Sequence, residues 1–225
     1  MKKIVICGDS YFSADLRFSG THFSELLDCD QYINLARTGC SNTCIRLQVS
    51  RAIELSPDLI ILGASDHSRL EIPLEKYIRE NGLDNIEYAD SHYGYNFSST
   101  IVNQNPQRRV TMLSDHINTL SRLGYLPKNK AVAFKHFITE LWDENWEQER
   151  NKFIIESSLY ALQASSIQFV YMPNTNYVPD GLDKKNVFDI NIKEMEKHDI
   201  GETTYHTTEK SQKQIAQKLK EFLDV

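Results

Sequence analysis

Ile4-Val5-Ile6-Cys7-Gly8-Asp9-Ser10 is the stretch of this 225-residue chain that decides its fold. Four consecutive apolar residues are typical of a strand that is buried on both faces of a parallel sheet. Ser10 therefore follows the carboxyl end of the first predicted strand. In an open α/β sheet this is the edge where ligands bind, so Ser10 is a candidate nucleophile. A Gly-Asp-Ser triplet is also a plain strand-to-helix turn, so the choice depends on the rest of the chain.

Beyond this stretch, short apolar runs alternate with helical patterns. Further strands are predicted at 32–35, 59–62 and 167–172. A helix capped by Ser41 or Asn42 precedes the 59–62 strand, and an amphipathic helix begins at Thr207 or Thr208. This order predicts a single α/β domain over 1–225. Its architecture is a three-layer α/β/α sandwich with a mainly parallel central sheet of flavodoxin-like type.

The middle of the chain is harder to interpret. A helical and loop insertion is predicted at about 72–150, where periodicity is weak. Apolar residues between Phe134 and Ala164 fit either one long helix or two helices with a break near Asp143–Asn145. The aromatic residues of this region form either the core of the insertion or a platform that binds sugar or acyl groups; they are Tyr93, Tyr95, Phe97, Trp142 and Trp146.

Composition and charge exclude several classes of function. The net charge of −6 is spread along the chain, with no basic stripe for a nucleic acid. Because no stretch approaches about 20 apolar residues, no membrane partner is expected, and we expect the protein in the cytoplasm. The four cysteines lack the spacing of a zinc site and are interpreted as reduced thiols. No metal and no organic cofactor is expected.

Acyl transfer by a serine needs a base, a group that orients the base, and donors for the oxyanion. Ser65 and Asp66 follow the 59–62 strand, and Gly39 follows the second strand by a few residues. These positions lie near the same sheet edge as Ser10. His206 precedes the last helix in a loop that can fold back over the sheet, and it is the candidate base.

The order of these motifs resembles the SGNH, or GDSL-type, family of serine hydrolases. Gly8-Asp9-Ser10 is similar to its first block, Asn34–Gly39 to the second, Pro57–Asp66 to the third, and Tyr205-His206-Thr207 to the last. The resemblance covers roughly 1–70 and 165–225. It implies Ser10 as the nucleophile and His206 as its base. It also implies an oxyanion hole formed by the backbone N–H groups of Ser10 and Gly39.

Two residues depart from the family pattern. Ser65 stands where the family has an asparagine that donates to the oxyanion, and its hydroxyl can still donate one hydrogen bond. Thr203 stands where the family has the aspartate that orients the histidine. Glu202, Asp199 or a backbone carbonyl can take over this role, and the sequence does not decide among them.

The residues beside these motifs have two interpretations. Asp9, Asp66 and Arg69 are candidates for binding a polar substrate, whereas Ser65-Asp66 can simply end a strand and cap a turn. Arg69 can also form an ordinary surface ion pair with Glu71. The histidines other than His206, among them His22, show no metal-type spacing and are interpreted as solvated or structural.

The resemblance implies a serine hydrolase that cleaves a small acyl or carbohydrate O-acyl ester. Its expected partner is the small-molecule or carbohydrate substrate, and the sequence does not predict an oligomeric state. The substitutions at Ser65 and Thr203 favour an alternative, a catalytically weak or inactive binding module on the same fold.

Overall fold

The computed structural model describes residues 2–13, 20–36, 41–65, 69–73, 97–101, 121, 127–173, 177–190, 192, 195 and 207–223. Its strands are β1 (Lys3–Cys7), β2 (Gln31–Asn34), β3 (Leu59–Gly63), β4 (Arg69–Pro73), β5 (Phe97–Ile101) and β6 (Gln168–Met172). Its α-helices are α1 (Asn42–Glu54), α4 (Lys128–His136), α5 (Glu144–Ser165) and α6 (Glu209–Leu223). Shorter helical segments are η2 (Phe23–Leu26), η4 (Phe137–Leu141) and η5 (Lys184–Asn186).

The central sheet has four strands in the order β2-β1-β3-β6, and all its neighbours are parallel. Strand β1 lies inside the sheet, and Ile4, Val5 and Ile6 are buried, as the apolar run predicts. Because the strands are parallel, their carboxyl ends share one edge, and Ser10 and Ser65 follow β1 and β3 there. The predicted α/β fold with a parallel central sheet is confirmed.

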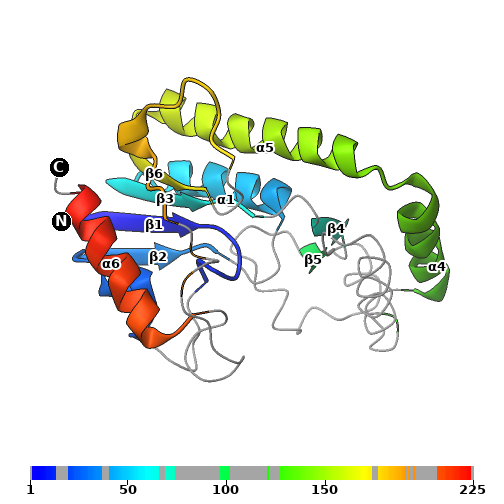
Figure 1. Cartoon of the computed structure of the whole chain (residues 1–225), viewed down its shortest axis with the longest axis horizontal. Helices are drawn as coiled ribbons and strands as arrows, with labels where there is room; N and C mark the ends of the chain where they lie inside the picture. The colour runs from blue at the N-terminus through cyan, green and yellow to red at the C-terminus, as the bar shows by residue number, and fades with distance from the viewer. Residues whose placement is uncertain are drawn as a thin grey trace.

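Helices cover both faces of this sheet (Figure 1). Val5, Ile60 and Phe169 are aligned across three strands and pack with α1 and α5. Ile6, Ile61 and Val170 form the next row on the opposite face and pack with α6 and η2. The side chains alternate because successive residues of a strand point to opposite faces. The result is the predicted three-layer sandwich.

The helical region between 128 and 165 is interrupted. Helix α4 continues into the π-helical turn η4, and α5 begins after a break at Trp142 and Asp143. The Asp143 side chain accepts a hydrogen bond from the Trp146 N–H and caps α5. The two-helix alternative is therefore the observed one. Strands β4 and β5 pair antiparallel in a separate two-stranded sheet, so part of the predicted insertion is strand.

Phe12 fixes the chain immediately after β1. Its side chain is fully buried between Gly8 at the end of β1 and Gly63 at the end of β3. A Cβ atom added at Gly8 would lie 2.6 Å from the Phe12 ring, and one at Gly63 only 2.0 Å from it. Only glycine at positions 8 and 63 leaves room for the Phe12 ring to pack against the backbone. The buried ring in turn anchors the turn that carries Ser10.

Candidate functional site

Ser10 lies in a single helical turn at the end of β1. The Asp9 carbonyl accepts hydrogen bonds from the N–H groups of Phe12 and Ser13, both at 3.0 Å. The Asp9 side chain caps the same turn by accepting from the Tyr11 N–H at 3.0 Å. Ser10 is thus the first residue after a capping aspartate, and its residue exposure is 4%.

Asp9 also connects this turn to the end of β3. The Ser65 hydroxyl donates to Asp9 Oδ2 at 3.1 Å, and both residues are almost completely buried. The residue that stands at the family's asparagine position is therefore bonded to the residue before the candidate nucleophile. Ser65 as an oxyanion donor stays a prediction, and in that role its hydroxyl would have to turn away from Asp9. Asp9 as a substrate-binding residue also stays a prediction.

Helix α1 holds the ends of β1 and β3 with two buried side-chain amides. Gln48 accepts from the Gly8 N–H at 2.7 Å and donates to the Gly8 carbonyl at 3.2 Å. Asn42 does the same at Ser65, accepting from its N–H at 2.8 Å and donating to its carbonyl at 2.7 Å. Asn42 also donates to Asn151 of α5 at 2.6 Å. At these strand ends the two amides therefore supply hydrogen-bond partners to the buried N–H and carbonyl groups of Gly8 and Ser65.

A chain of hydrogen bonds supports the Ser10 turn from the opposite side of the sheet. Asn34 of β2 donates to the Phe12 carbonyl at 2.9 Å and to the Tyr32 hydroxyl at 2.7 Å. The Tyr32 hydroxyl lies 2.8 Å from the Ser24 hydroxyl, which lies 2.6 Å from His22 Nδ1. His22 Nε2 is 3.2 Å from the Tyr11 carbonyl, which closes the chain at the turn.

The partners of His22 determine its protonation. A carbonyl oxygen only accepts, so Nε2 carries the proton and donates to Tyr11. Nδ1 then accepts from the Ser24 N–H, 3.4 Å away, and from the Ser24 hydroxyl. Burial lowers the pKa of His22 to about 4, although the bond to the Tyr11 carbonyl opposes this shift. His22 is therefore a neutral structural residue, as one of the two interpretations predicted.

The lowered pKa of His22 predicts a loss of stability in acid. Well above pH 6.5 the ring is neutral in both the folded and the unfolded chain. As the pH falls from 6.5 towards 4, only the unfolded chain takes up the proton, so the free energy of unfolding decreases. The expected loss is about 2–3 kcal/mol by pH 4.5. Urea unfolding at pH 7.5 and pH 4.5 measures it.

His22→Gln is the matched variant, because glutamine keeps one donor and one acceptor but does not titrate. Carboxyl groups titrate in the same range in both proteins, so only the difference between wild type and variant counts. Equal losses of unfolding free energy in the two proteins would contradict the assignment of this loss to His22.

Several predicted site residues lie outside the described residues. They are Gly39, Asp66, Glu202 and His206, together with Asp199 and Thr203. Arg69 is the first residue of β4. The described part of the site therefore consists of the Ser10 turn, Ser65 and the polar residues that hold them.

Sequence reasoning missed the polar residues that support the turn, above all Asn42 and Gln48. One signal was available. Gln48 lies three residues after Ile45 and one before Val49, on the apolar face of the predicted helix. A polar side chain in such a stripe indicates a buried hydrogen-bond partner. The partner itself could not be named, because Gly8 lies 40 residues away.

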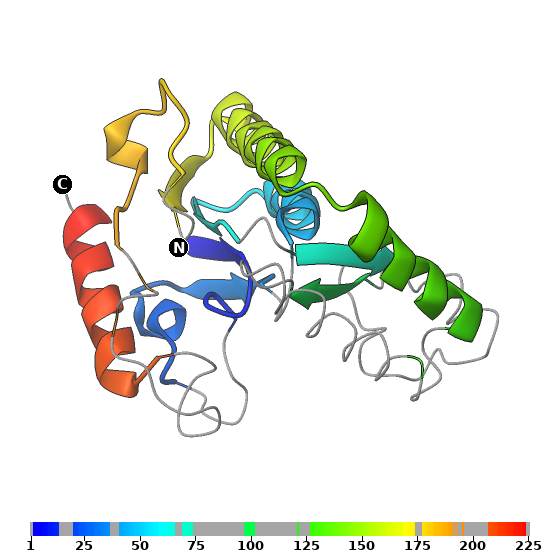
Figure 2. The same ribbon diagram turned by 45° about the vertical axis from the view of Figure 1, so that its right-hand side comes forward.

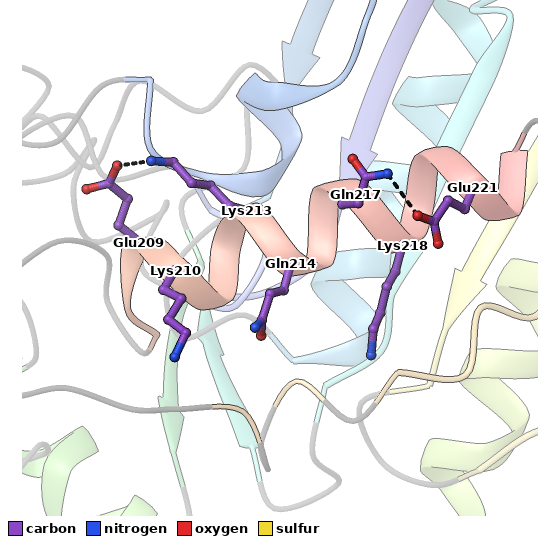
Figure 3. Close-up of a pocket in the computed structure, with 7 residues that line it drawn as sticks. All are labelled: Glu209, Lys210, Lys213, Gln214, Gln217, Lys218 and Glu221. Carbon is purple, nitrogen blue, oxygen red and sulfur yellow. Dashed lines mark hydrogen bonds and ion pairs between the residues drawn. The ribbon is translucent and has the colours of Figure 1, made fainter.

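Figure 3 shows a hollow along the exposed surface of α6. The described residues that line it all belong to α6, among them Lys210, Lys213 and Lys218. Lys213 pairs with Glu209 at 2.7 Å, and Gln217 donates to Glu221 at 2.8 Å. These are ordinary contacts between neighbouring turns of an exposed helix. The described residues that line this hollow include neither Ser10 nor Ser65.

Among the helices that the structure describes, none has the length and apolar character needed to cross a bilayer. Three of the four cysteines, Cys7, Cys29 and Cys44, fall within the described residues and are free thiols. Burial raises the pKa of Cys7, so this thiol at the end of β1 stays protonated.

Comparisons with known proteins do not assign this chain to a family. No protein-family model matches the chain, and no curated protein matches it. Among solved structures, it is similar to a GDSL-like lipase from Bacteroides thetaiotaomicron, with 12% identity and a TM-score of 0.33. The match covers 99% of this chain and 88% of the lipase. So low a TM-score carries no argument about activity, and the fold assignment rests on the parallel sheet and its two helical layers.

Proposed function

We propose that this protein is a serine hydrolase that cleaves small acyl or carbohydrate O-acyl esters. Ser10 attacks the acyl carbonyl, and His206 takes the serine proton and returns it to the leaving alcohol. The acyl-enzyme is then hydrolysed by a water that His206 activates. The backbone N–H groups of Ser10 and Gly39, and the hydroxyl of Ser65, bind the oxyanion. Glu202 orients His206, and Asp9, Asp66 and Arg69 bind the polar part of the substrate.

The observation that carries this proposal is the position of Ser10. It lies three residues after the end of β1, a central strand, at the ligand-binding edge of a parallel sheet. Its turn is fixed by the Asp9 cap, the bonds of His22 and Asn34 to adjacent carbonyls, and the buried Phe12 ring. A rigid backbone around a serine is what preorganised oxyanion donors require.

A fluorophosphonate probe tests the proposal directly. Wild type and the control Ser13→Ala, which changes the neighbouring serine of the same turn, are expected to be labelled once, at Ser10. Ser10→Ala is expected to take up no label. His206→Gln should slow labelling by roughly 10²-fold or more, because it removes the general base. Peptide mass spectrometry locates the label, and p-nitrophenyl acetate and acetylated oligosaccharides then test turnover.

Two observations favour the alternative of a non-catalytic binding module. Ser10 is only 4% exposed, and the Ser65 hydroxyl is directed to Asp9. If wild type and Ser10→Ala show the same labelling and the same background hydrolysis, the hydrolase proposal is wrong. Binding of an intact acylated sugar without turnover would then support the module.

A further inference from the structure

Asn34, the last residue of β2, has a side-chain amide whose contacts fix its orientation. Its Nδ2 group donates to the Phe12 carbonyl at 2.9 Å and to the Tyr32 hydroxyl at 2.7 Å. Its Oδ1 atom accepts from the Ala36 N–H at 2.8 Å. Because a carbonyl only accepts and a backbone N–H only donates, the amide cannot be turned over. Both amide N–H groups and the amide oxygen are therefore engaged, and the side chain is held in one position.

The two backbone groups that Asn34 binds belong to different segments of the chain. Strand β2 lies beside β1 and runs in the same direction (Figures 1 and 2). Just beyond β2, the Leu35 N–H donates to the Ile6 carbonyl at 2.8 Å. From there β1 continues into the Ser10 turn, whereas β2 continues to Ala36. The Asn34 side chain connects these two segments where their strands end.

Both ends of this connection are buried. Phe12 is fully buried, and its N–H donates to the Asp9 carbonyl at 3.0 Å. Ala36 is also almost completely buried. The Tyr32 hydroxyl accepts from the second amide N–H of Asn34 and so keeps the side chain turned towards both segments. Because packed interiors transmit displacements, the amide passes the position of one segment to the other.

We propose that Asn34 is a positioning residue for the oxyanion hole. This inference rests on the proposed function, in which the N–H groups of Ser10 and Gly39 bind the oxyanion. Gly39 lies outside the described residues, three positions after Ala36 along the chain. By bonding Phe12 and Ala36, Asn34 fixes the spacing between the Ser10 turn and the start of the segment that leads to Gly39. Such spacing matters because catalytic groups must be held to within about 0.5 Å of their productive geometry.

This role predicts a specific kinetic effect. The oxyanion forms in the transition state and is absent from the bound ester, so misplaced donors lower kcat and leave KM nearly unchanged. Asn34→Leu should lower kcat for p-nitrophenyl acetate roughly tenfold or more, a part of the roughly 10²–10³-fold cost of losing one donor completely. Asn34→Asp should have a similar effect, because a carboxylate keeps an oxygen for the Ala36 N–H but cannot donate to the Phe12 carbonyl.

Tyr32→Phe is the matched control. It removes the third bond of the same amide and leaves the bonds to Phe12 and Ala36 in place. Its kcat should fall less than that of either Asn34 variant. All kcat values are expressed per site that a fluorophosphonate finally labels, so a smaller fraction of folded protein does not lower them.

A trifluoromethyl ketone gives a second readout. The Ser10 oxygen adds to its carbonyl carbon, the serine proton passes to His206, and the carbonyl oxygen becomes an oxyanion that needs the same donors. The inhibition constant should therefore rise in Asn34→Leu and Asn34→Asp by the factor by which kcat/KM falls. A purely structural role of Asn34 would leave this constant unchanged in the molecules that remain folded.

The outcomes separate this inference from the hydrolase proposal. If Asn34→Leu has fewer labelled sites but the wild-type kcat at each site, Asn34 only stabilises the fold and the inference is wrong. It is also wrong if Asn34→Asp retains the wild-type kcat, or if Tyr32→Phe loses as much as Asn34→Leu, because the bond to Phe12 would then not be the cause. A wild type that is neither labelled nor active contradicts the hydrolase proposal itself, and the inference about Asn34 falls with it.

Discussion

Gly63→Ala is expected to lower the free energy of unfolding by roughly 3 kcal/mol or more, the upper range for overpacking in a core. The new Cβ would lie 2.0 and 2.1 Å from two ring atoms of Phe12, whose side chain is fully buried. Neither partner can easily move, because Gly63 belongs to β3 and Phe12 to the turn that carries Ser10. Urea unfolding of the variant and the wild type measures the loss.

Two further variants make this prediction specific. Gly181→Ala meets no atom within 4 Å and has a φ of 83°, so it should cost only about 1–2 kcal/mol, from its left-handed backbone. Phe12→Leu removes the two ring atoms closest to the new Cβ, and Gly63→Ala should then cost less in the Phe12→Leu background. If the cost is the same in both backgrounds, the contact with Phe12 is not its cause.

Asn42→Leu should lower the free energy of unfolding by about 3 kcal/mol. Leucine has a similar size, but it leaves the N–H and the carbonyl of the fully buried Ser65 without the partners that Asn42 gives them. Because Ser65 binds Asp9, the loss should also displace the turn that carries Ser10. We expect slower fluorophosphonate labelling at urea concentrations far below the unfolding transition, where global stability does not limit the reaction.

Asn151→Leu is the matched control for Asn42→Leu. It removes a single bond to the same amide at a less buried position and should cost about 1 kcal/mol. Its labelling rate should stay close to that of the wild type. Equal effects of the two substitutions on stability and labelling would show that Asn42 does not act through Ser65.

The layers of this fold and the positions of its central strands follow from local patterns in the sequence. The apolar runs predicted β1, β3 and β6 to within a residue, and of the two predicted caps of α1, Ser41 and Asn42, the structure shows Ser41. Periodicity left the break in the 128–165 region open, because apolar residues on both sides keep a helical spacing. The structure decides between one helix and two, because the Asp143 side chain accepts a hydrogen bond from the Trp146 N–H and so marks the start of α5.

The support of the candidate site could not be predicted in the same way. Asn42 binds Ser65 and Asn151, which are 23 and 109 residues away. Hydrophobic periodicity reports which face of an element is buried, but not which polar group it meets across the core. His22 shows the same limit, since its ring bonds the Tyr11 carbonyl, which lies 11 residues away on a different segment. Among the residues of the candidate site, Ser10 was found from a local motif, the Gly8-Asp9-Ser10 triplet that follows β1.

The two amides of α1 have a consequence for the order of folding. Gln48 and Asn42 can make their bonds only after β1, β3 and α5 have docked against α1, and all of these contacts close long loops. Contacts of this kind form late, because the loop-closure entropy must be overcome first. The geometry around Ser10 should therefore appear together with the native state rather than in a partly folded chain. If Ser10 reacts with the fluorophosphonate as proposed, the extent of labelling at each time during refolding would report the fraction of molecules that have reached the native state.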